Sequence, residues 1–177
     1  MLVVQTTHKL GYRGLARFDK KANYAVLSFA DLVNGGQLSI TIEPKKGKRY
    51  QGIVPLDGKN LAECVENYFD QSEQLKTRIW LFNNEDQVFG LFLQALPDML
   101  SEDSFEHLVY LASTLKSEEC FSVDGEVILH RLFHQETVRG LQQDEVKFTC
   151  GCSRKKMLDS VCLLPADELE EIFQSKQ

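Results

Sequence analysis

Short apolar runs separated by polar turns make up the first part of the chain, up to Pro97. Within Leu38–Ile42 apolar and polar residues alternate with a period of two, which is typical of a strand with one buried face. The other segments expected to be strands are Tyr12–Phe18, Arg49–Val54, Arg78–Phe82 and Gln87–Leu93. The polar turns Pro44–Gly47 and Asn83–Asp86 join four of them in pairs, which predicts two hairpins.

A helical spacing of apolar residues interrupts the strands between the two predicted hairpins. The residues that share this spacing are Leu61, Cys64, Val65, Tyr68 and Phe69. Asn60 and Glu63 stand where an N-cap and its partner three residues later are found, so a helix is expected to begin there.

After Pro97 the pattern becomes helical. A capping box is expected at Asp103 and Glu106, and a second helix is expected to run from Asp124 to near Gly140. The apolar stripes of these two helices are Phe105, Leu108, Ala112 and Leu115, and then Ile128, Leu129, Leu132 and Phe133. A small helical tail is predicted around Leu169, Ile172 and Phe173.

Together these elements predict an α+β fold. We expect an antiparallel or mixed β-sheet domain packed with helices over residues 1–97, followed by a helical connector over 98–143 and a small C-terminal region over 144–177.

Charge divides the chain into a basic and an acidic part. Residues 1–59 contain ten Lys and Arg against four Asp and Glu, whereas residues 60–177 contain ten against twenty-two. The net charge of −6 argues against a general nucleic-acid binder. Within the connector, residues 98–140 hold nine acids and three bases, so we expect repulsion to make this segment the first to open.

The basic run Lys45–Arg49 admits two interpretations. A lysine-rich hairpin tip is usually a solvated turn that protects a strand edge, and this is the favoured interpretation. Nucleic-acid binding is the other, but only Tyr50 is placed to stack on a base.

Apolar run lengths and cysteine content limit the location. The longest apolar run, Val88–Leu93, is too short to span a bilayer, so no membrane partner is expected. No signal peptide is visible after Met1, and the five cysteines are expected to be reduced thiols. A cytoplasmic location follows as an expectation.

Enzyme signatures are missing from the sequence, which contains no nucleophile elbow, phosphate loop or dinucleotide-binding glycine motif. His130 and His134 could reach one metal from one helix face. The zinc-protease helix, however, requires Glu directly after the first histidine, where this chain has Arg131. Solvated histidines are the favoured interpretation, and the chain is not expected to be an enzyme.

The cysteines offer the clearest candidate chemistry. Cys150 and Cys152 stand one residue apart, directly before three cations, Arg154, Lys155 and Lys156. Cations favour thiolates, the form of cysteine that binds zinc or attacks a disulfide. Two accidental loop cysteines remain the alternative.

The other three cysteines are interpreted as inert. Cys64 and Cys162 are expected to pack among apolar residues. At Cys120 the neighbouring carboxylates are expected to raise the pKa of the thiol.

Several longer runs resemble the heat shock protein 33 family of redox-regulated holdase chaperones, also called 33 kDa chaperonin. The runs that carry the resemblance are Arg13–Arg17, Arg49–Val54, Asn67–Gln74 with Thr77 and Arg78, Leu91–Pro97, Leu132–Glu136 and Val146–Arg154. They follow the family's order and span nearly the whole chain.

The resemblance implies an ATP-independent chaperone of the cytoplasm that binds unfolded or misfolded client proteins and forms a homodimer when oxidised. In the reduced family member, a Cys-x-Cys and a later Cys-x-x-Cys hold one zinc ion. Oxidation forms two disulfides, releases the zinc, and unfolds the small domain and its connector. Cys150 and Cys152 match the first pair, so the resemblance makes them zinc ligands and redox-active cysteines.

The chain departs from the family pattern at both ends. It is expected to begin inside the family's N-terminal domain, so that its first predicted strand has no preceding partner. It contains no Cys-x-x-Cys, so Cys150 and Cys152 are expected to form a partial zinc site, with zinc held by the reduced full-length protein. Two functions stay open: a redox-switched holdase, and a protein- or nucleic-acid-interaction module that kept the fold and lost the switch.

Overall fold

The computed structural model describes residues 1–19, 23–97, 100–140, 142–150, 153–165 and 168. The chain forms two compact units. One consists of Met1–Lys21 and Gly140–Gln177, and the other of Ala22–Arg139. The helical tail predicted around Leu169 lies outside the described residues.

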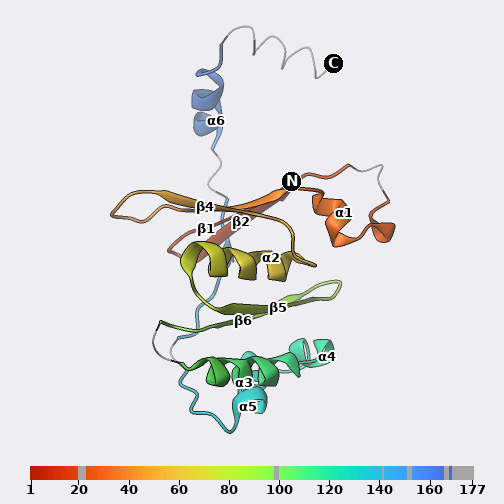
Figure 1. The fold of residues 1–177 in the computed structure, drawn as a ribbon. Coiled ribbons are helices and arrows are strands. Elements are labelled where there is room, and N and C mark those ends of the chain that lie inside the picture. Colours follow the sequence, from red (N-terminus) through yellow and green to blue (C-terminus); the bar gives the residue numbers. More distant parts are fainter. Residues whose placement is uncertain (20–22, 98–99, 141, 151–152, 166–167, 169–177) are drawn as a thin grey trace. The chain divides into compact units, whose positions relative to one another are not determined.

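The first unit contains a three-stranded mixed sheet (Figure 1). The strand β1 (Leu2–Thr6) pairs antiparallel with β2 (Gly11–Ala16), and the short β7 (Lys147–Phe148) pairs parallel with the other edge of β2. Helix α6 (Arg154–Val161) follows β7 along the chain.

Strand β2 confirms the strand expected over 12–18, although it begins and ends earlier. The expectation that this strand lacks a preceding partner is wrong, because β1 pairs with it from Tyr12 to Ala16. The turn between them closes where the Thr7 N–H donates to the Gly11 carbonyl oxygen at 2.8 Å. The sequence of β1, Leu-Val-Val-Gln-Thr, is rich in the β-branched residues that favour strands.

The second unit contains two hairpins and most of the helices. A 3-10 turn, η1 (Tyr24–Val26), and α1 (Phe29–Val33) precede the hairpin of β3 (Gln37–Ile42) and β4 (Tyr50–Pro55). Helix α2 (Leu61–Tyr68) and a π-helical turn, η2 (Phe69–Glu73), lead into the hairpin of β5 (Thr77–Asn83) and β6 (Val88–Gln94). The helices that follow are α3 (Glu102–Ser113), α4 (Ser117–Cys120) and α5 (Gly125–Phe133). Both predicted hairpins are confirmed, whereas α1 and α4 were not predicted.

The hairpin of β5 and β6 lies between helices on both of its faces (Figure 1). One face presents the cross-strand pairs Trp80–Leu91 and Phe82–Phe89, and these rings and side chains pack against the core of the following helices. That core consists of Ala112, Leu115, Cys120, Ile128, Leu132 and Phe133. On the other face the Phe92 ring meets the Phe69 ring edge to face, with centroids 5.4 Å apart. Both helical layers therefore depend on this hairpin.

The helix boundaries follow local capping chemistry. The N-cap predicted at Asn60 is confirmed, since its Oδ1 accepts from the Glu63 N–H at 2.9 Å. The capping box predicted at Asp103 is wrong: Ser101 caps α3 by accepting from the Ser104 N–H at 3.2 Å. Because Ser101 is the N-cap, Glu102 and Asp103 both lie in the first turn of α3, where the helix dipole favours negative charge.

Helix α5 is shorter than expected. It begins after Asp124, as predicted, but ends at Phe133 and not near Gly140. The apolar spacing stops at Phe133, and the polar residues after it give the helix no further face to bury. Leu129 was expected on the buried face but is exposed, whereas Ile128 and Leu132 are buried.

A tyrosine pair fixes the end of α2 to β4. The hydroxyls of Tyr50 and Tyr68 both donate to Glu73 Oε1, at 2.7 and 3.0 Å. Burial, with a further contribution from Glu73, raises the pKa of Tyr68 to about 12, so its hydroxyl keeps its proton and remains a donor. Gly52 makes this approach possible, because a Cβ there would lie 2.6 Å from Tyr68 Cε2.

We expect Gly52→Ala to lower the free energy of unfolding by about 1 to 3 kcal/mol, because the new methyl group overpacks against the Tyr68 ring. Gly90→Ala is the matched control: its Cβ would meet Leu81 Cδ2 at 3.5 Å, an ordinary contact, and the effect should stay within about 1 kcal/mol. Urea denaturation measures both variants. Equal stabilities for the two would contradict the close approach at Gly52.

Candidate functional site

Cys150 is exposed and lies directly after the strand β7 and Thr149. Its predicted partner, Cys152, lies outside the described residues. The disulfide between them and their role as zinc ligands therefore stay predictions.

The segment before Cys150 is held to β2 by backbone hydrogen bonds. The Lys147 N–H donates to the Leu10 carbonyl oxygen at 3.0 Å, and the Thr149 N–H donates to the Tyr12 carbonyl oxygen at 2.9 Å. The Phe148 and Tyr12 rings meet edge to face, with centroids 6.0 Å apart. Cys150 thus follows a short strand whose partner lies near the start of the chain.

Downstream of the cysteine motif, Arg154 and Lys155 begin helix α6 and are exposed. These are two of the cations expected to favour thiolates at Cys150 and Cys152.

The remaining cysteines differ in accessibility. Cys64 is fully buried on α2, as expected. Cys120 is also buried, and burial raises the pKa of its thiol; the nearby Glu119 carboxylate raises it too, but contributes less than burial does. Cys162 was expected to pack among apolar residues, but the structure shows it exposed directly after α6. Its neighbour Leu163, on which that expectation depended, is itself 85% exposed.

The described part of the chain brings together no group of three or more His, Cys, Asp or Glu side chains that could hold a metal ion. His130 and His134 are both exposed, and the His134 ring nitrogen Nδ1 lies 3.3 Å from the Arg131 carbonyl oxygen. The described residues therefore do not complete the four-ligand zinc site of the expectation.

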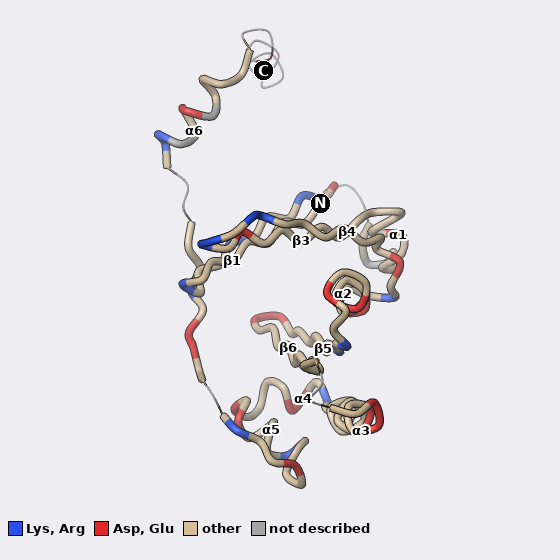
Figure 2. Tube along the Cα trace, turned by 60° about the vertical axis from the view of Figure 1, so that its left-hand side comes forward, with Lys and Arg blue, Asp and Glu red and all other residues tan. Residues whose placement is uncertain are grey.

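The connector helices cover a large apolar surface. Ile128 and Phe133 of α5 and Ala112 of α3 are buried together, and the partly buried rings of Trp80, Phe82 and Phe89 pack against their cluster. These helices also carry acidic residues, with Glu102 and Asp103 opening α3 and Glu118 and Glu119 in α4 (Figure 2). Glu102 is paired with Lys76, and Glu119 with Arg131 at 3.4 Å. An apolar interface thus lies beneath helices whose acidic charge is only partly compensated.

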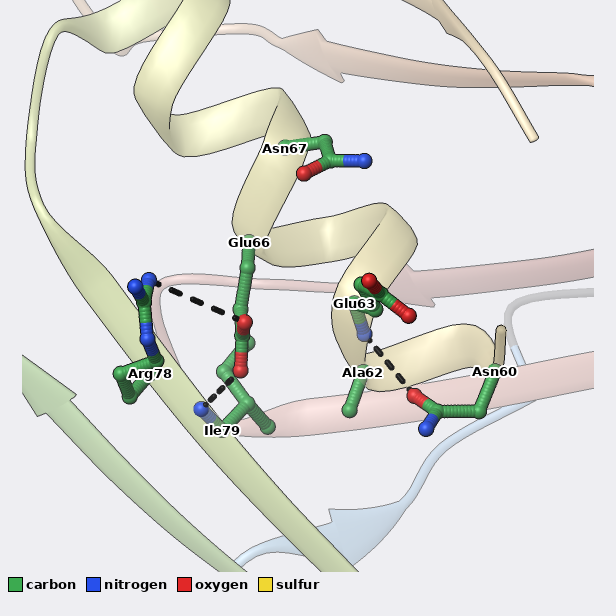
Figure 3. Close-up of a pocket in the computed structure, with 7 residues that line it drawn as sticks. All are labelled: Asn60, Ala62, Glu63, Glu66, Asn67, Arg78 and Ile79. Carbon is green, nitrogen blue, oxygen red and sulfur yellow. Dashed lines mark hydrogen bonds and ion pairs between the residues drawn. The ribbon is translucent and has the colours of Figure 1, made fainter. Parts of the chain in front are cut away.

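A polar cavity of about 380 Å³ lies between α2 and β5 (Figure 3). The residues that line it are Asn60, Ala62, Glu63, Glu66, Asn67, Arg78 and Ile79. The Glu66 carboxylate accepts from the Ile79 N–H at 2.6 Å through one oxygen, and its other oxygen lies 3.9 Å from Arg78 Nη1. Glu66 therefore satisfies a backbone group of β5 that β6 does not reach.

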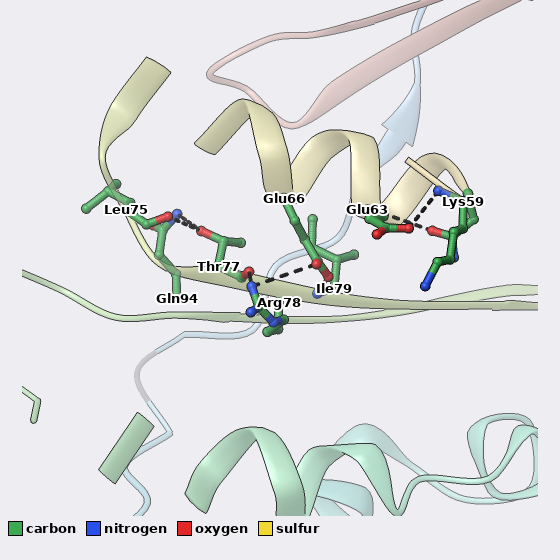
Figure 4. A network of polar contacts seen from close by, with 9 residues as sticks. Lys59, Glu63, Glu66, Leu75, Thr77, Arg78, Ile79 and Gln94 are labelled. Carbon is green, nitrogen blue, oxygen red and sulfur yellow. Dashed lines mark hydrogen bonds and ion pairs between the residues drawn. The ribbon is translucent and has the colours of Figure 1, made fainter. Parts of the chain in front are cut away.

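The same strand continues in a chain of polar contacts (Figure 4). Arg78 Nη1 donates to the Thr77 carbonyl oxygen at 2.9 Å. The buried Thr77 hydroxyl donates to the Leu75 carbonyl oxygen at 3.0 Å and accepts from Gln94 Nε2 at 2.9 Å. Two of these three hydrogen bonds satisfy backbone carbonyl groups and the third satisfies the buried Thr77 hydroxyl, which indicates a structural network and not a catalytic one.

The predicted basic hairpin tip is exposed between β3 and β4, and Arg49 pairs with Glu43 at 3.4 Å. Surface pairs of this kind contribute little to stability. None of the helices in the described residues has the length and apolarity needed to cross a bilayer.

Comparison with known proteins identifies the family to which the chain is similar. The family model described as "Hsp33 protein" matches residues 1–177. The 33 kDa chaperonin of Shewanella sp. (strain W3-18-1) is 48% identical over 162 residues, covering 91% of this chain and 56% of that protein. The 33 kDa chaperonin of Pseudomonas aeruginosa (strain LESB58) is 42% identical over 183 residues, covering 100% of this chain and 62% of that protein.

The fold agrees with this similarity. The crystal structure of the heat shock protein 33 homolog from Thermotoga maritima matches with a TM-score of 0.74 at 23% identity, over 98% of this chain and 63% of that one. The chain belongs to the Hsp33 family and spans about six tenths of the length of the curated relatives it matches. These relatives are named as chaperonins, in agreement with the expectation that the chain is not an enzyme.

We expect the cysteines to react with iodoacetamide in two groups. Cys150 and Cys162 are exposed and should be labelled first, whereas Cys64 and Cys120 should be labelled only when the chain unfolds. The raised pKa of Cys120 lowers its thiolate fraction further at about pH 8. Peptide mass mapping of native and urea-unfolded protein measures each site, and rapid native labelling of Cys120 would show that α4 does not stay packed.

We expect Ile128→Ala to lower the free energy of unfolding by about 2 to 5 kcal/mol, because it opens a cavity in the helix core. Leu129→Ala, one position along the same helix at an exposed site, should change it by less than about 1 kcal/mol. Hydrogen exchange should show faster opening of α3 in the first variant only. Similar values for both would mean that α5 does not hold the helices to the hairpin.

Proposed function

We propose that the chain is part of a redox-regulated, ATP-independent holdase that binds unfolding proteins under oxidative stress and prevents their aggregation. The observation that carries this proposal is the match of the whole chain to the Hsp33 family with Cys150-Gly151-Cys152 in its sequence. Unfolded or misfolded proteins are the proposed clients, and the cytoplasm is the proposed location.

The client surface that we propose is the apolar interface beneath the connector. When α3 to α5 lift from the hairpin of β5 and β6, the face that bears Trp80, Phe82 and Phe89 becomes available to apolar segments of a client. The acidic charge of residues 98–140 favours this opening. Apolar burial is non-directional, so such a surface accepts many client sequences.

The proposed switch is the oxidation of Cys150 and Cys152 in the region 144–177. Peroxide takes up the two thiol protons and two electrons, forming one disulfide bond and two water molecules. In the reduced full-length protein we propose that the two thiolates are half of a zinc site. Zinc would add folding energy to a region with little apolar core. A homodimer of the oxidised form is part of the same proposal.

An interaction module without a switch is the second candidate function, and the exposed basic tip of β3 and β4 is the observation that favours it. A module of this kind would bind an acidic partner in both redox states. Its affinity would fall as the salt concentration rises, because the contacts are ionic.

We expect the peroxide-oxidised protein to suppress light scattering from a thermally unfolding client without ATP, and the reduced protein to suppress it at least about ten-fold less. Cys150→Ser and Cys152→Ser should both remove the effect of peroxide, since a serine hydroxyl forms no disulfide. Cys162→Ser is the matched control at another exposed cysteine and should behave as the unaltered chain does.

Equal suppression by the oxidised and reduced proteins would rule out the redox switch and leave a chaperone. No suppression by either, together with salt-sensitive binding of an acidic polymer, would favour the interaction module.

A further inference from the structure

The strand β7 covers only a short part of the outer edge of β2, the edge that faces away from β1. It contributes two residues, Lys147 and Phe148, and both are exposed. The Phe148 side chain is 67% exposed, so its packing on Tyr12 buries little apolar area. The attachment therefore rests on few contacts, the backbone bonds from Lys147 and Thr149 to the carbonyl oxygens of Leu10 and Tyr12 and this one ring contact, so the loss of any of them should loosen the strand.

The edge that β7 covers is shaped for an extended backbone. Leu10 and Tyr12 present carbonyl oxygens to it, and the Tyr12 ring supplies an apolar contact. Gly11, between them, has no side chain, and a Cβ there would lie 2.9 Å from Thr149 Oγ1. The absence of a side chain at Gly11 thus lets another strand lie close beside β2.

We propose that the outer edge of β2 is a binding site for an extended segment of a client polypeptide. In the reduced chain β7 occupies this site. The client strand would run parallel to β2, donate N–H groups to Leu10 and Tyr12, and place an aromatic side chain against the Tyr12 ring. This deepens the proposed holdase function and rests on it.

An unfolded client suits this edge better than a second copy of the chain does. Backbone hydrogen bonds hold a strand whatever its sequence. The contact of Phe148 with the Tyr12 ring requires only an aromatic side chain at that position. Unfolding proteins supply such extended segments with unpaired backbone groups. Neither kind of contact demands the particular sequence of this chain.

The position of β7 connects the site to the cysteine motif. The Thr149 N–H makes the last bond of the strand to β2, and Cys150 follows it directly. A change of backbone conformation at Cys150 on oxidation therefore acts on the adjacent bond and helps to release β7. The edge then becomes available at the same time as the apolar interface of the connector.

Proline substitutions in the 177-residue chain test the site. Thr149→Pro removes the N–H that donates to Tyr12 and should release β7. Val146→Pro is the matched control, because alternate residues of a parallel strand donate toward the neighbour and Lys147 and Thr149 are the donors here. Phe148→Ala is a second releasing variant that leaves the backbone intact.

The probe is a fluorescein-labelled peptide with the sequence of residues 144–149, and binding is followed by fluorescence anisotropy. Thr149→Pro and Phe148→Ala should bind it at least about ten-fold more tightly than the unaltered chain, and Val146→Pro within about two-fold of it. A peptide with alanine in place of its phenylalanine should bind the released variants more weakly. Circular dichroism checks that each variant is folded.

Folded Thr149→Pro and Phe148→Ala variants that bind the peptide no better than Val146→Pro would overturn the proposal. Dimerisation of those variants without any gain in peptide binding would assign the edge to a second copy and overturn it equally. Light scattering separates this from the holdase function: if the oxidised chain protects its client while the peptide result is negative, only the β2 site fails. If the peptide binds as expected but no client is protected, the site stands and the holdase function fails.

Discussion

The burial of both faces of one hairpin is the constraint on which the second unit depends. A two-stranded hairpin is at best marginally stable in water by itself, and β5 and β6 have only each other as strand neighbours among the described residues. Their apolar side chains alternate between a face covered by α2 and η2 and a face covered by α3 to α5. Removal of either layer would expose aromatic side chains of the hairpin, so the packing of the helices and the stability of the strands are coupled.

The two helical layers differ in how firmly they are tied to the hairpin. Glu66 of α2 bonds the backbone of β5, and the tyrosines that meet at Glu73 tie the end of α2 to β4. The α3 to α5 layer is held by apolar packing and by an exposed ion pair between Glu102 of α3 and Lys76, and it lies in a segment rich in acidic residues. Apolar contacts have no fixed geometry, and the charges oppose close packing. This asymmetry is consistent with a layer that detaches while the rest keeps its fold.

Periodicity in the sequence predicted the elements that bury a face, and it failed where no face is buried. Ile128 and Leu132 recur at helical spacing and are buried, and Asn60 was recognisable as an N-cap because its polar oxygen precedes an apolar stripe. The strand β7 is too short to show a pattern, and its partner Tyr12 lies near the other end of the sequence. The bond from Ile79 to Glu66 likewise depends on how α2 packs on β5, which no local spacing encodes. For Cys150 and Cys152 the sequence supplied the motif, and its spacing alone could not say how the surrounding backbone is held.

The polar cover of the β5 edge has a consequence for solubility. A protein that works among aggregating chains risks being recruited into the aggregate through its own open strands. At β5 a carboxylate and a guanidinium occupy the backbone groups at Thr77 and Ile79, so a foreign strand would have to displace charged side chains to pair there. Strand addition at β5 is therefore disfavoured, which is what the proposed function requires of a chain that meets aggregating proteins.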